Sequence, residues 1–446
     1  MTPVIDLMEA DPFYQAFYGK TTVDPFGLVM LLICAVMAMS LPRRWTFLPV
    51  AILSCFVSYA QRVVLFSLNF NFLRLLTIVV WLRIILRKEY RPFIWTTLDY
   101  LVLWWAISST VSYTLLWGTS GALTLKLGHA LDSVGVYFFI RMLVRDAEDV
   151  ERVASFFMVL SIPVAAFFLI ERVTGHNLFG FLGGVPVNTV IRGGKLRCQG
   201  AFAHPILAGA YWSVQIPLFM AAALKGKRVA YIAIACALFI IAVSSSSTPV
   251  TSTLVGLIGM AFYVFRFQMR AVRRAAAAGI VALALIMKAP VYALIARVDF
   301  TGSSTGYHRY TLVDQAVKHF GEWWLIGVQS TNHWGAFMYD VANQYVNEAV
   351  RGGLATLVLF LAIITFAFKY AGGLMREAHA QNFRTEEILA WSLGVTILIH
   401  SANFIGIGYF GQITVLWYLG LAMCSGLVSA SQRLPQMRRL QSTVLQ

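Results

Sequence analysis

Charged side chains are scarce in this sequence of 446 residues. Only 12% of the residues are Asp, Glu, Lys or Arg, about half of the roughly 25% that is usual for soluble domains. This scarcity excludes an ordinary soluble protein. In place of charge the chain has 59% hydrophobic residues and a mean hydropathy of +0.71. Because apolar runs recur along the whole length, the composition predicts an integral membrane protein with many spans.

Acidic residues are the scarcer charged kind, with 20 of them against 35 basic residues and a formal net charge of +15. In a soluble chain this surplus would suggest a nucleic-acid partner. In a membrane protein, basic residues in short loops set the orientation of the spans. We therefore expect the surplus to serve topology and expect no nucleic acid as partner.

Cysteines are few and scattered. There are five, an odd number, and no two form a Cys-x-x-Cys pair. This pattern supports neither a disulfide framework nor a zinc site. We expect no metal and no organic cofactor.

The apolar runs predict an all-α polytopic membrane protein, because backbone polar groups in lipid have to be hydrogen-bonded within their own segment. We expect about 12–13 transmembrane helices in a single integral membrane domain over residues 1–446. The predicted spans lie near residues 26–41, 46–61, 70–86, 98–117, 122–143, 152–171, 201–224, 229–245, 248–265, 276–297, 346–370, 386–404 and 410–430.

Short basic loops, such as 41–45 and 225–228, are expected to face the cytoplasm. Counting spans from them places two other loops together on the external (periplasmic) face, the basic loop 172–200 and the longer loop 298–349. The longer loop is too aromatic to be disordered, and its segment 311–320 has helical spacing of apolar residues. We expect it to contain short helices and to cap the membrane bundle.

Arg74 and Arg83 fall inside the predicted span 70–86, and Arg141 falls inside the predicted span 122–143. Arg83 and Arg141 lie near cytoplasmic ends, so we expect their side chains to reach out to the membrane surface. Arg74 lies near an external end, and a charged residue inside a span is a candidate for function.

The loop 172–200 is basic although it is predicted to be external, where the positive-inside bias disfavours basic residues. Arg192, Lys195 and Arg197 occur within six residues, spaced by glycines, and the loop has no carboxylate. Solvated charge on a polar loop is one explanation. The functional alternative is an anion-binding site at the external surface.

A lipid-linked pyrophosphate is an anion that suits this position, because guanidinium groups match phosphate geometry and can replace a metal in a partly dry site. Transfer from such a donor also needs a general base for the acceptor hydroxyl. The second external loop offers His308, His333 and Asp340 as candidates for this catalytic role.

Three segments resemble motifs of the O-antigen ligase and polysaccharide polymerase superfamily, which consists of bacterial membrane glycosyltransferases. Arg197-Cys-Gln-Gly-Ala-Phe-Ala-His-Pro205 is similar to the family's "Arg-x-x-Gly-x-Phe-x-x-Pro" signature. The segment from Tyr307 to Gly327 resembles the second motif, which begins with an arginine. Asp340-Val-Ala-Asn-Gln-Tyr-Val346, continued to Leu354, resembles "His-Asn-x-Tyr-Leu…Glu-x-Gly". The three occur in the family's order, and together with the hydropathy of roughly a dozen spans and the large external loop the similarity covers most of the chain.

The resemblance implies that Arg197 and Arg309 bind the pyrophosphate of an undecaprenyl-pyrophosphate-linked oligosaccharide. The family's histidine does not carry over, because Ala342 occupies its position, and Arg351 occupies that of the family's glutamate. The base therefore has to be sought among other residues.

Further residues are assigned to the site by position. Arg192, Lys195 and Arg74 are expected to add to the pyrophosphate site, and Asn343 and Tyr345 belong to the third motif. Two roles are open for His204, which either lines the mouth of the site or caps the following helix. The four serines 244–247 are interpreted as a polar external turn.

These expectations combine into a metal-independent glycosyltransferase. It would move a glycan from the undecaprenyl-pyrophosphate donor to an acceptor glycan on the periplasmic face of the bacterial inner membrane, as a multi-pass protein. The departure at Ala342 favours a polymerase for exopolysaccharide, capsule or O-antigen, with chain-length or export proteins as further partners. Two alternatives stay open: a ligase that transfers glycan to lipid A-core, and a transporter of anionic or lipid-linked substrates.

Overall fold

Helices make up almost all of the regular structure in the computed structural model, which describes residues 20–65, 68–90, 93–297 and 305–444. In the first half of the chain these are α2 (Pro25–Ser40), α3 (Phe47–Phe56), α4 (Phe72–Leu86), α5 (Thr97–Trp117), α6 (Ser120–Ala130), α7 (Val136–Leu143) and α8 (Ala147–Thr174). The second half contains α9 (Pro205–Ser213), α10 (Ile216–Leu224), α11 (Arg228–Val243), α12 (Ser247–Ala261), α13 (Met269–Ile286), α14 (Thr305–Lys318), α15 (Phe320–Trp323), α16 (Gln344–Ala380), α17 (Arg384–Asn403) and α18 (Ile413–Val444).

Strands in the described ranges form two short antiparallel hairpins, β1 (Arg62–Leu65) with β2 (Leu68–Asn71) and β3 (Val190–Arg192) with β4 (Lys195–Arg197). Short 3₁₀-helical segments connect longer elements: η1 (Arg43–Trp45), η3 (Leu178–Leu182), η4 (Phe262–Phe265), η5 (Val291–Arg297) and η6 (Asn332–Trp334). A π-helical turn, η2 (Leu131–Gly135), joins α6 to α7.

In the part of the chain that the structure describes, five helical stretches are long and apolar enough to cross a membrane: Ala147–Thr174, Pro205–Leu224, Ser247–Phe265, Gln344–Ala380 and Ile413–Gln432. The apolar helices α2 and α11 are shorter. The structure is thus that of an all-α membrane protein in the coarse sense. The larger number of spans in the sequence analysis stays a prediction.

Most predicted spans coincide with helices, and two do not. The span expected at 46–61 ends early, because α3 stops at Phe56 and the chain then turns into the β1–β2 hairpin. The span expected at 276–297 is displaced, because α13 runs over Met269–Ile286 and includes the basic residues before the apolar run.

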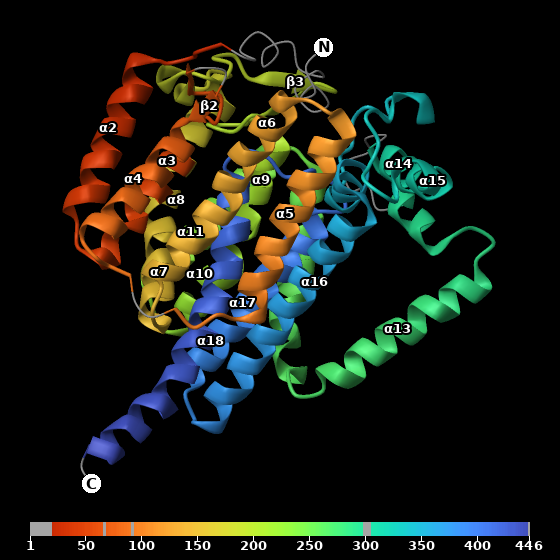
Figure 1. Ribbon diagram of the computed structural model, residues 1–446. Helices are drawn as coiled ribbons and strands as arrows, with labels where there is room; N and C mark the ends of the chain where they lie inside the picture. Colours follow the sequence, from red (N-terminus) through yellow and green to blue (C-terminus); the bar gives the residue numbers. More distant parts are fainter. Residues whose placement is uncertain (1–19, 66–67, 91–92, 298–304, 445–446) are drawn as a thin grey trace.

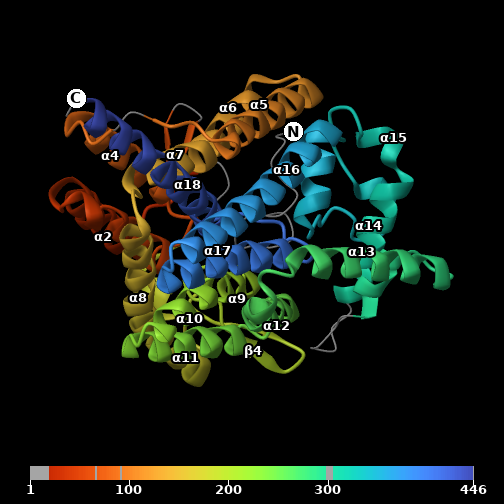
Figure 2. The same ribbon diagram turned by 90° about the horizontal axis from the view of Figure 1, so that it is seen from below.

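Most helices pack together in one bundle, with α13 outside it (Figure 1). In the view from below, α16, α17 and α18 pass through the middle, with α5 to α7 on one side and α9 to α12 on the other (Figure 2). The β3–β4 hairpin and the helices α14 and α15 lie at the same end of the bundle. Both loops that carry the candidate site residues are therefore at one end.

The helix termini follow from local sequence. Asp24 and Asp146 cap α2 and α8 by accepting a hydrogen bond from the first turn. Thr96 and Asp99 form a reciprocal capping box at the start of α5. Gly118 ends α5 in the left-handed conformation that favours glycine. These signals mark the residues at which the helices begin and end.

Arg83 and Arg141 do not reach the membrane surface, contrary to expectation. Both are buried, and each pairs with a carboxylate: an Arg83 Nη atom lies 2.8 Å from Glu89, and Arg141 Nε lies 2.8 Å from Asp99. A buried charge is tolerated when it is paired and hydrogen-bonded. These arginines therefore connect neighbouring helices inside the bundle.

The segment α14–α15 has its own small hydrophobic core. Leu312, Trp323, Trp334 and Met338 are buried there against the first turns of α16. The expected helix within 311–320 is confirmed, as part of α14. We call residues 305–339 the cap.

Helix α16 breaks at Gly353, whose φ of 75° and ψ of −177° are not helical. The chain of the cap fills the break: the Leu354 amide donates to the Trp324 carbonyl at 2.8 Å, and the Val328 amide donates to the Val350 carbonyl at 2.7 Å. A Cβ atom at position 353 would fall on the Leu325 carbonyl oxygen. The absence of a side chain at Gly353 thus permits the cap to dock.

Replacing Gly353 by alanine is expected to lower the free energy of unfolding by about 1–3 kcal/mol, because it imposes an unfavourable backbone conformation and displaces the cap. Thermal unfolding of the detergent-solubilised protein measures the effect. Gly372→Ala in the same helix is the matched control, since nothing lies within 4 Å of its Cβ position, and it should be neutral or stabilising. Equal melting temperatures for the two variants would contradict the docking role of Gly353.

Helix α13 stands apart from the bundle. It has no buried residue, and it leads from the end of α12 at one side of the membrane domain towards the cap at the other (Figure 1). Its first turns carry Arg270, Arg273 and Arg274, and its later turns are apolar and exposed, as at Leu285 and Ile286. It therefore acts as a tether of the cap.

Candidate functional site

Arg197 is carried into the bundle by the β3–β4 hairpin. The hairpin turns at Gly193 and Gly194, both with positive φ, as a two-residue hairpin turn requires. Along β4 the exposure falls from Lys195, which is exposed, to Arg197, which retains only 9% of its accessible surface. The hairpin thus places a guanidinium group inside the protein.

The guanidinium group of Arg197 has few partners. One Nη atom donates to the Ser246 hydroxyl at 2.8 Å, and its Nε is buried without a hydrogen-bond partner among the residues that the structure describes. Among the described residues no carboxylate forms an ion pair with it. Burial and the positive charge of Arg192 lower the pKa of Arg197. Since an uncompensated buried charge is costly, this site favours an anion from outside the protein.

Arg309 reaches the same place from α14. An Nη atom donates to the Thr248 hydroxyl at 2.7 Å, and a Cβ atom at Gly406 would lie 2.9 Å from the guanidinium carbon. Gly406 follows α17, so the guanidinium group lies between the cap, α12 and the loop after α17.

The turn between α11 and α12 brings the two arginines together. Ser246 and Thr248, their partners, are two residues apart, so their Cα atoms are separated by at most about 7 Å. The Ser245 hydroxyl donates to the Leu196 carbonyl at 3.2 Å and holds the turn against β4. We call Arg197 and Arg309 the arginine pair. Of the polar external turn predicted at 244–247, the structure has a turn over residues 244–246, whereas Ser247 begins α12 and three of the four serines are buried. The role of this turn in positioning the pair was not predicted.

Glu171, at the end of α8, holds the segment that follows Arg197. It is fully buried and accepts hydrogen bonds from the backbone amides of Gln199 at 3.0 Å and Gly200 at 3.1 Å. The Thr189 hydroxyl donates to it at 3.2 Å. This carboxylate joins both strands of the hairpin loop to α8.

Exchange of Glu171 for glutamine is expected to cost about 1–2 kcal/mol of stability, because an amide offers one acceptor oxygen where the carboxylate offers two charged ones. The loop that carries Arg197 should become mobile as a result. Hydrogen exchange of the 189–200 backbone amides measures this directly. Glu148→Gln, at the exposed start of the same helix, serves as control and should leave exchange unchanged.

Asp340 and His308 lie beside Arg309. A His308 ring nitrogen is 3.2 Å from the carbonyl oxygen of Asp340, and the Asp340 side chain is partly buried. Burial raises the pKa of Asp340, and the charges of His308 and Arg309 act in the opposite direction. Of the three candidate bases, Asp340 and His308 are thus close to the arginine pair.

His333, the third candidate base, has its contacts within the cap. A ring nitrogen is 2.7 Å from Glu322, and the side chain is exposed. Its ring also packs near those of His319 and Trp334. These contacts place His333 on the surface of the cap, and its role as a base stays a prediction.

Arg192 and Lys195 are both exposed on the hairpin, where they face each other across the ladder. Arg192 is close enough to influence Arg197 electrostatically. They add positive charge on the hairpin that carries Arg197.

Arg74 does not join the pair, contrary to expectation. Two of its nitrogens bind Asp132 at 2.6 and 2.8 Å, and it also donates to the Asn69 carbonyl. The Tyr59 hydroxyl donates to the same carboxylate at 2.9 Å. Its charge is therefore compensated within the bundle.

The remaining predicted residues have structural partners. His204 caps α9, where its ring accepts from the Ile206 amide at 3.2 Å. The surrounding protein and the charges of Arg197 and Arg192 lower the pKa of His204. Asn343 caps α16 and donates to the Ile405 carbonyl at 3.0 Å. The Tyr345 hydroxyl donates to the Ser401 carbonyl at 2.9 Å. The capping role proposed for His204 is thus confirmed.

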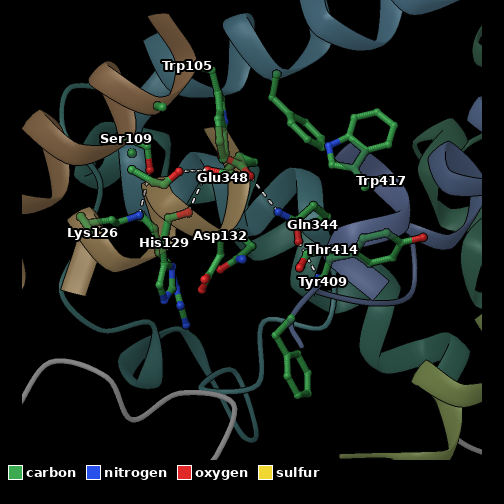
Figure 3. A pocket seen from close by; sticks show the side chains of 18 of the residues that line it. Trp105, Ser109, Lys126, His129, Asp132, Gln344, Glu348, Tyr409, Thr414 and Trp417 are labelled. Atoms are coloured by element: carbon green, nitrogen blue, oxygen red, sulfur yellow. Dashed lines mark hydrogen bonds between the residues drawn. The ribbon is translucent and has the colours of Figure 1, made fainter. Parts of the chain in front are cut away.

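A cavity of about 240 Å³ lies between α5, α6, α16 and the start of α18 (Figure 3). Ionisable side chains line it from two sides, Lys126, His129 and Asp132 from α6 and η2 and Glu348 and Arg351 from α16. This cavity was not predicted from the sequence. A signal was present, because charged and histidine residues at intervals of three inside an apolar span are rare in membranes and mark functional sites.

No three His, Cys, Asp or Glu side chains in the described part of the chain come together as a group that could hold a metal ion. The chemistry available at the arginine pair is that of guanidinium groups with a neighbouring carboxylate and imidazole.

Neither the models of known protein families nor the curated protein sequences contain a match to this chain.

Proposed function

We propose that the protein is a membrane glycosyltransferase that moves a glycan from an undecaprenyl-pyrophosphate donor to the hydroxyl group of an acceptor sugar. One observation carries the proposal: two arginines from loops far apart in sequence meet at one Ser/Thr turn, and Arg197 is buried there without an anionic partner. Guanidinium groups in this setting bind a phosphate more strongly than exposed ones, because the local dielectric constant is low.

The proposed reaction needs a base and a stabilised leaving group. A bond forms between the acceptor oxygen and the anomeric carbon of the donor, and the bond from that carbon to the pyrophosphate oxygen breaks. The electron pair stays on the pyrophosphate, whose growing negative charge Arg197 and Arg309 stabilise. The proton of the acceptor hydroxyl passes to Asp340, which lies beside Arg309. The charges of the arginines serve where other enzymes use a metal ion.

The acceptor decides between two versions of the reaction. A polymerase adds the glycan to another lipid-linked unit, and a ligase adds it to lipid A-core. The resemblance to the O-antigen ligase and polysaccharide polymerase superfamily, with Ala342 at the position of the family's histidine, favours the polymerase. The proposed place is the periplasmic face of a bacterial inner membrane, where chain-length or export proteins are the expected partners.

Transfer by the purified protein tests the proposal. The protein in lipid nanodiscs is given a synthetic undecaprenyl-pyrophosphate oligosaccharide, with EDTA present, and the products are analysed by mass spectrometry. We expect longer glycans on the lipid together with released undecaprenyl pyrophosphate. Glycan found only on added lipid A-core would identify a ligase instead. Intact donor, moved across a proteoliposome membrane without transfer, would favour the transporter and contradict the proposal.

A further inference from the structure

The cavity between α5, α6, α16 and α18 contains an ammonium group without a carboxylate partner. Lys126 Nζ donates to the Ser109 hydroxyl at 2.8 Å and lies 4.7 Å from the centre of the Tyr113 ring. Within the described ranges no carboxylate forms an ion pair with it. A charge that is partly removed from water and lacks a counter-ion is unfavourable, so the cavity is suited to an anionic group.

Glu348 cannot supply that counter-ion, because its own partners hold it in place. The Trp105 indole donates to one carboxylate oxygen at 2.9 Å, and the Gln344 amide donates to the other at 2.7 Å. Gln344 is fixed in turn by the Tyr409 backbone amide, which donates to it at 2.7 Å. Figure 3 shows this chain of hydrogen bonds beside Lys126. Glu348 therefore influences Lys126 only from beyond ion-pair distance.

The rest of the lining combines aromatic rings with hydroxyl and amide groups. Trp105, Trp417 and Tyr418 supply flat apolar surfaces, and the buried Asn347 Oδ1 atom has no hydrogen-bond partner. A ligand pocket typically joins apolar walls with a few placed polar groups, and an unsatisfied buried acceptor calls for a donor. A sugar ring offers apolar C–H faces together with hydroxyl donors and acceptors, so it matches this lining.

The cavity adjoins the arginine pair through two segments. Asp340 lies beside Arg309, and Gln344 in the cavity wall follows four residues later, at most about 14 Å away along the chain. The loop after α17 has Gly406 against Arg309 and Tyr409 in the cavity wall. A molecule in the cavity is therefore close to the proposed base.

We propose that this cavity binds the acceptor, and that the acceptor is a sugar carrying a carboxylate, which pairs with Lys126 while its ring lies against the tryptophans. The term acceptor rests on the proposed transfer, but the preference for an acidic sugar rests on the cavity alone. The carboxylate would take the position of the missing counter-ion, and the sugar hydroxyls would bond to Asn347 and Glu348.

Binding of methyl glucuronide and methyl glucoside tests the proposal, because the two probes differ only at C6, where the glucuronide has a carboxylate and the glucoside a hydroxymethyl group. Saturation-transfer NMR on the nanodisc-embedded protein, without donor, measures both affinities. We expect at least tenfold tighter binding of the glucuronide by the unmodified protein, loss of this preference in Lys126→Met, and partial retention in Lys126→Arg.

Lys369→Met is the matched control, because Lys369 also lies over an aromatic ring, 4.9 Å from the centre of Phe366, but belongs to a distant part of α16. It should keep the preference, and melting temperatures exclude misfolding in all three variants. Equal binding of the two probes, absence of binding, or a preference that survives Lys126→Met would overturn the inference. Because no donor is present, failure here leaves the transfer assay unaffected. A positive result here without transfer to any acceptor would contradict the proposed function instead.

Discussion

Replacement of Arg197 by alanine should reduce glycan transfer by about 10²–10³-fold, the effect of removing one preorganised charge donor from a transition state. Arg197 is the member of the arginine pair that is buried and lacks an anionic partner. Its interaction with the leaving pyrophosphate therefore strengthens as negative charge develops there. The initial rate of transfer by purified protein in nanodiscs, at saturating donor, measures the loss.

Variants of the neighbouring residues sharpen this test. Arg309→Ala should cause a loss of similar size, and the double variant should lose less than the product of both, because the two act on one group. Lysine at position 197 should restore only part of the rate, since it lacks the planar fork of donors. Arg172→Ala removes an exposed arginine near the same hairpin and should have little effect. If Arg197→Ala and Arg172→Ala lowered transfer equally, general surface charge would explain the result and the arginine pair would not.

The variant Asp340→Asn is expected to lower the rate of transfer by about 10²–10⁴-fold, the usual contribution of a general base. Burial raises the pKa of Asp340 above its ordinary value of 3.8. Transfer depends on the ionised form, so in the unmodified protein it should fall as the pH decreases through a value above 3.8. A pH profile of the transfer rate locates this limb, which should be absent from the residual activity of Asp340→Asn.

The melting temperature of Asp340→Asn distinguishes a loss of catalysis from a loss of folding. A raised pKa means that the fold favours the neutral carboxyl group, so ionisation of Asp340 costs stability as the pH rises above the pKa of the unfolded chain. The neutral asparagine avoids this cost, and its melting temperature at pH 7 should equal or exceed that of the unmodified protein. Retained transfer in Asp340→Asn, together with a loss in His308→Gln, would assign the base to His308 instead.

Hydropathy was sufficient to predict most helices of this protein. Local signals such as Asp24, Thr96 and Gly118 also mark where helices begin or end. The prediction failed where the boundary depends on something other than hydropathy. The run 276–297 omitted the basic first turns of α13, and the run 46–61 included residues that approach the β1–β2 hairpin.

The site could be predicted only in part, because its geometry depends on contacts between residues that are distant in sequence. Composition marks Arg74, Arg83 and Arg141 as unusual, but it does not reveal that Asp132, Glu89 and Asp99 compensate them. A family resemblance suggested the arginine pair, whereas its partners Ser246 and Thr248 belong to a serine-rich turn without a distinctive pattern. Their role depends on how α12 packs beside the hairpin and the cap.

The exposure of α13 affects how freely its sequence can change during evolution. Because none of its side chains is buried, exchange of one apolar residue for another there carries no packing penalty, and the segment is free to drift in sequence as long as it keeps its length and its basic start. Helix α16, with buried residues along much of its length and a glycine that permits docking of the cap, has far less freedom. A saturation mutagenesis screen should therefore show α13 as a tolerant stretch between two intolerant ones.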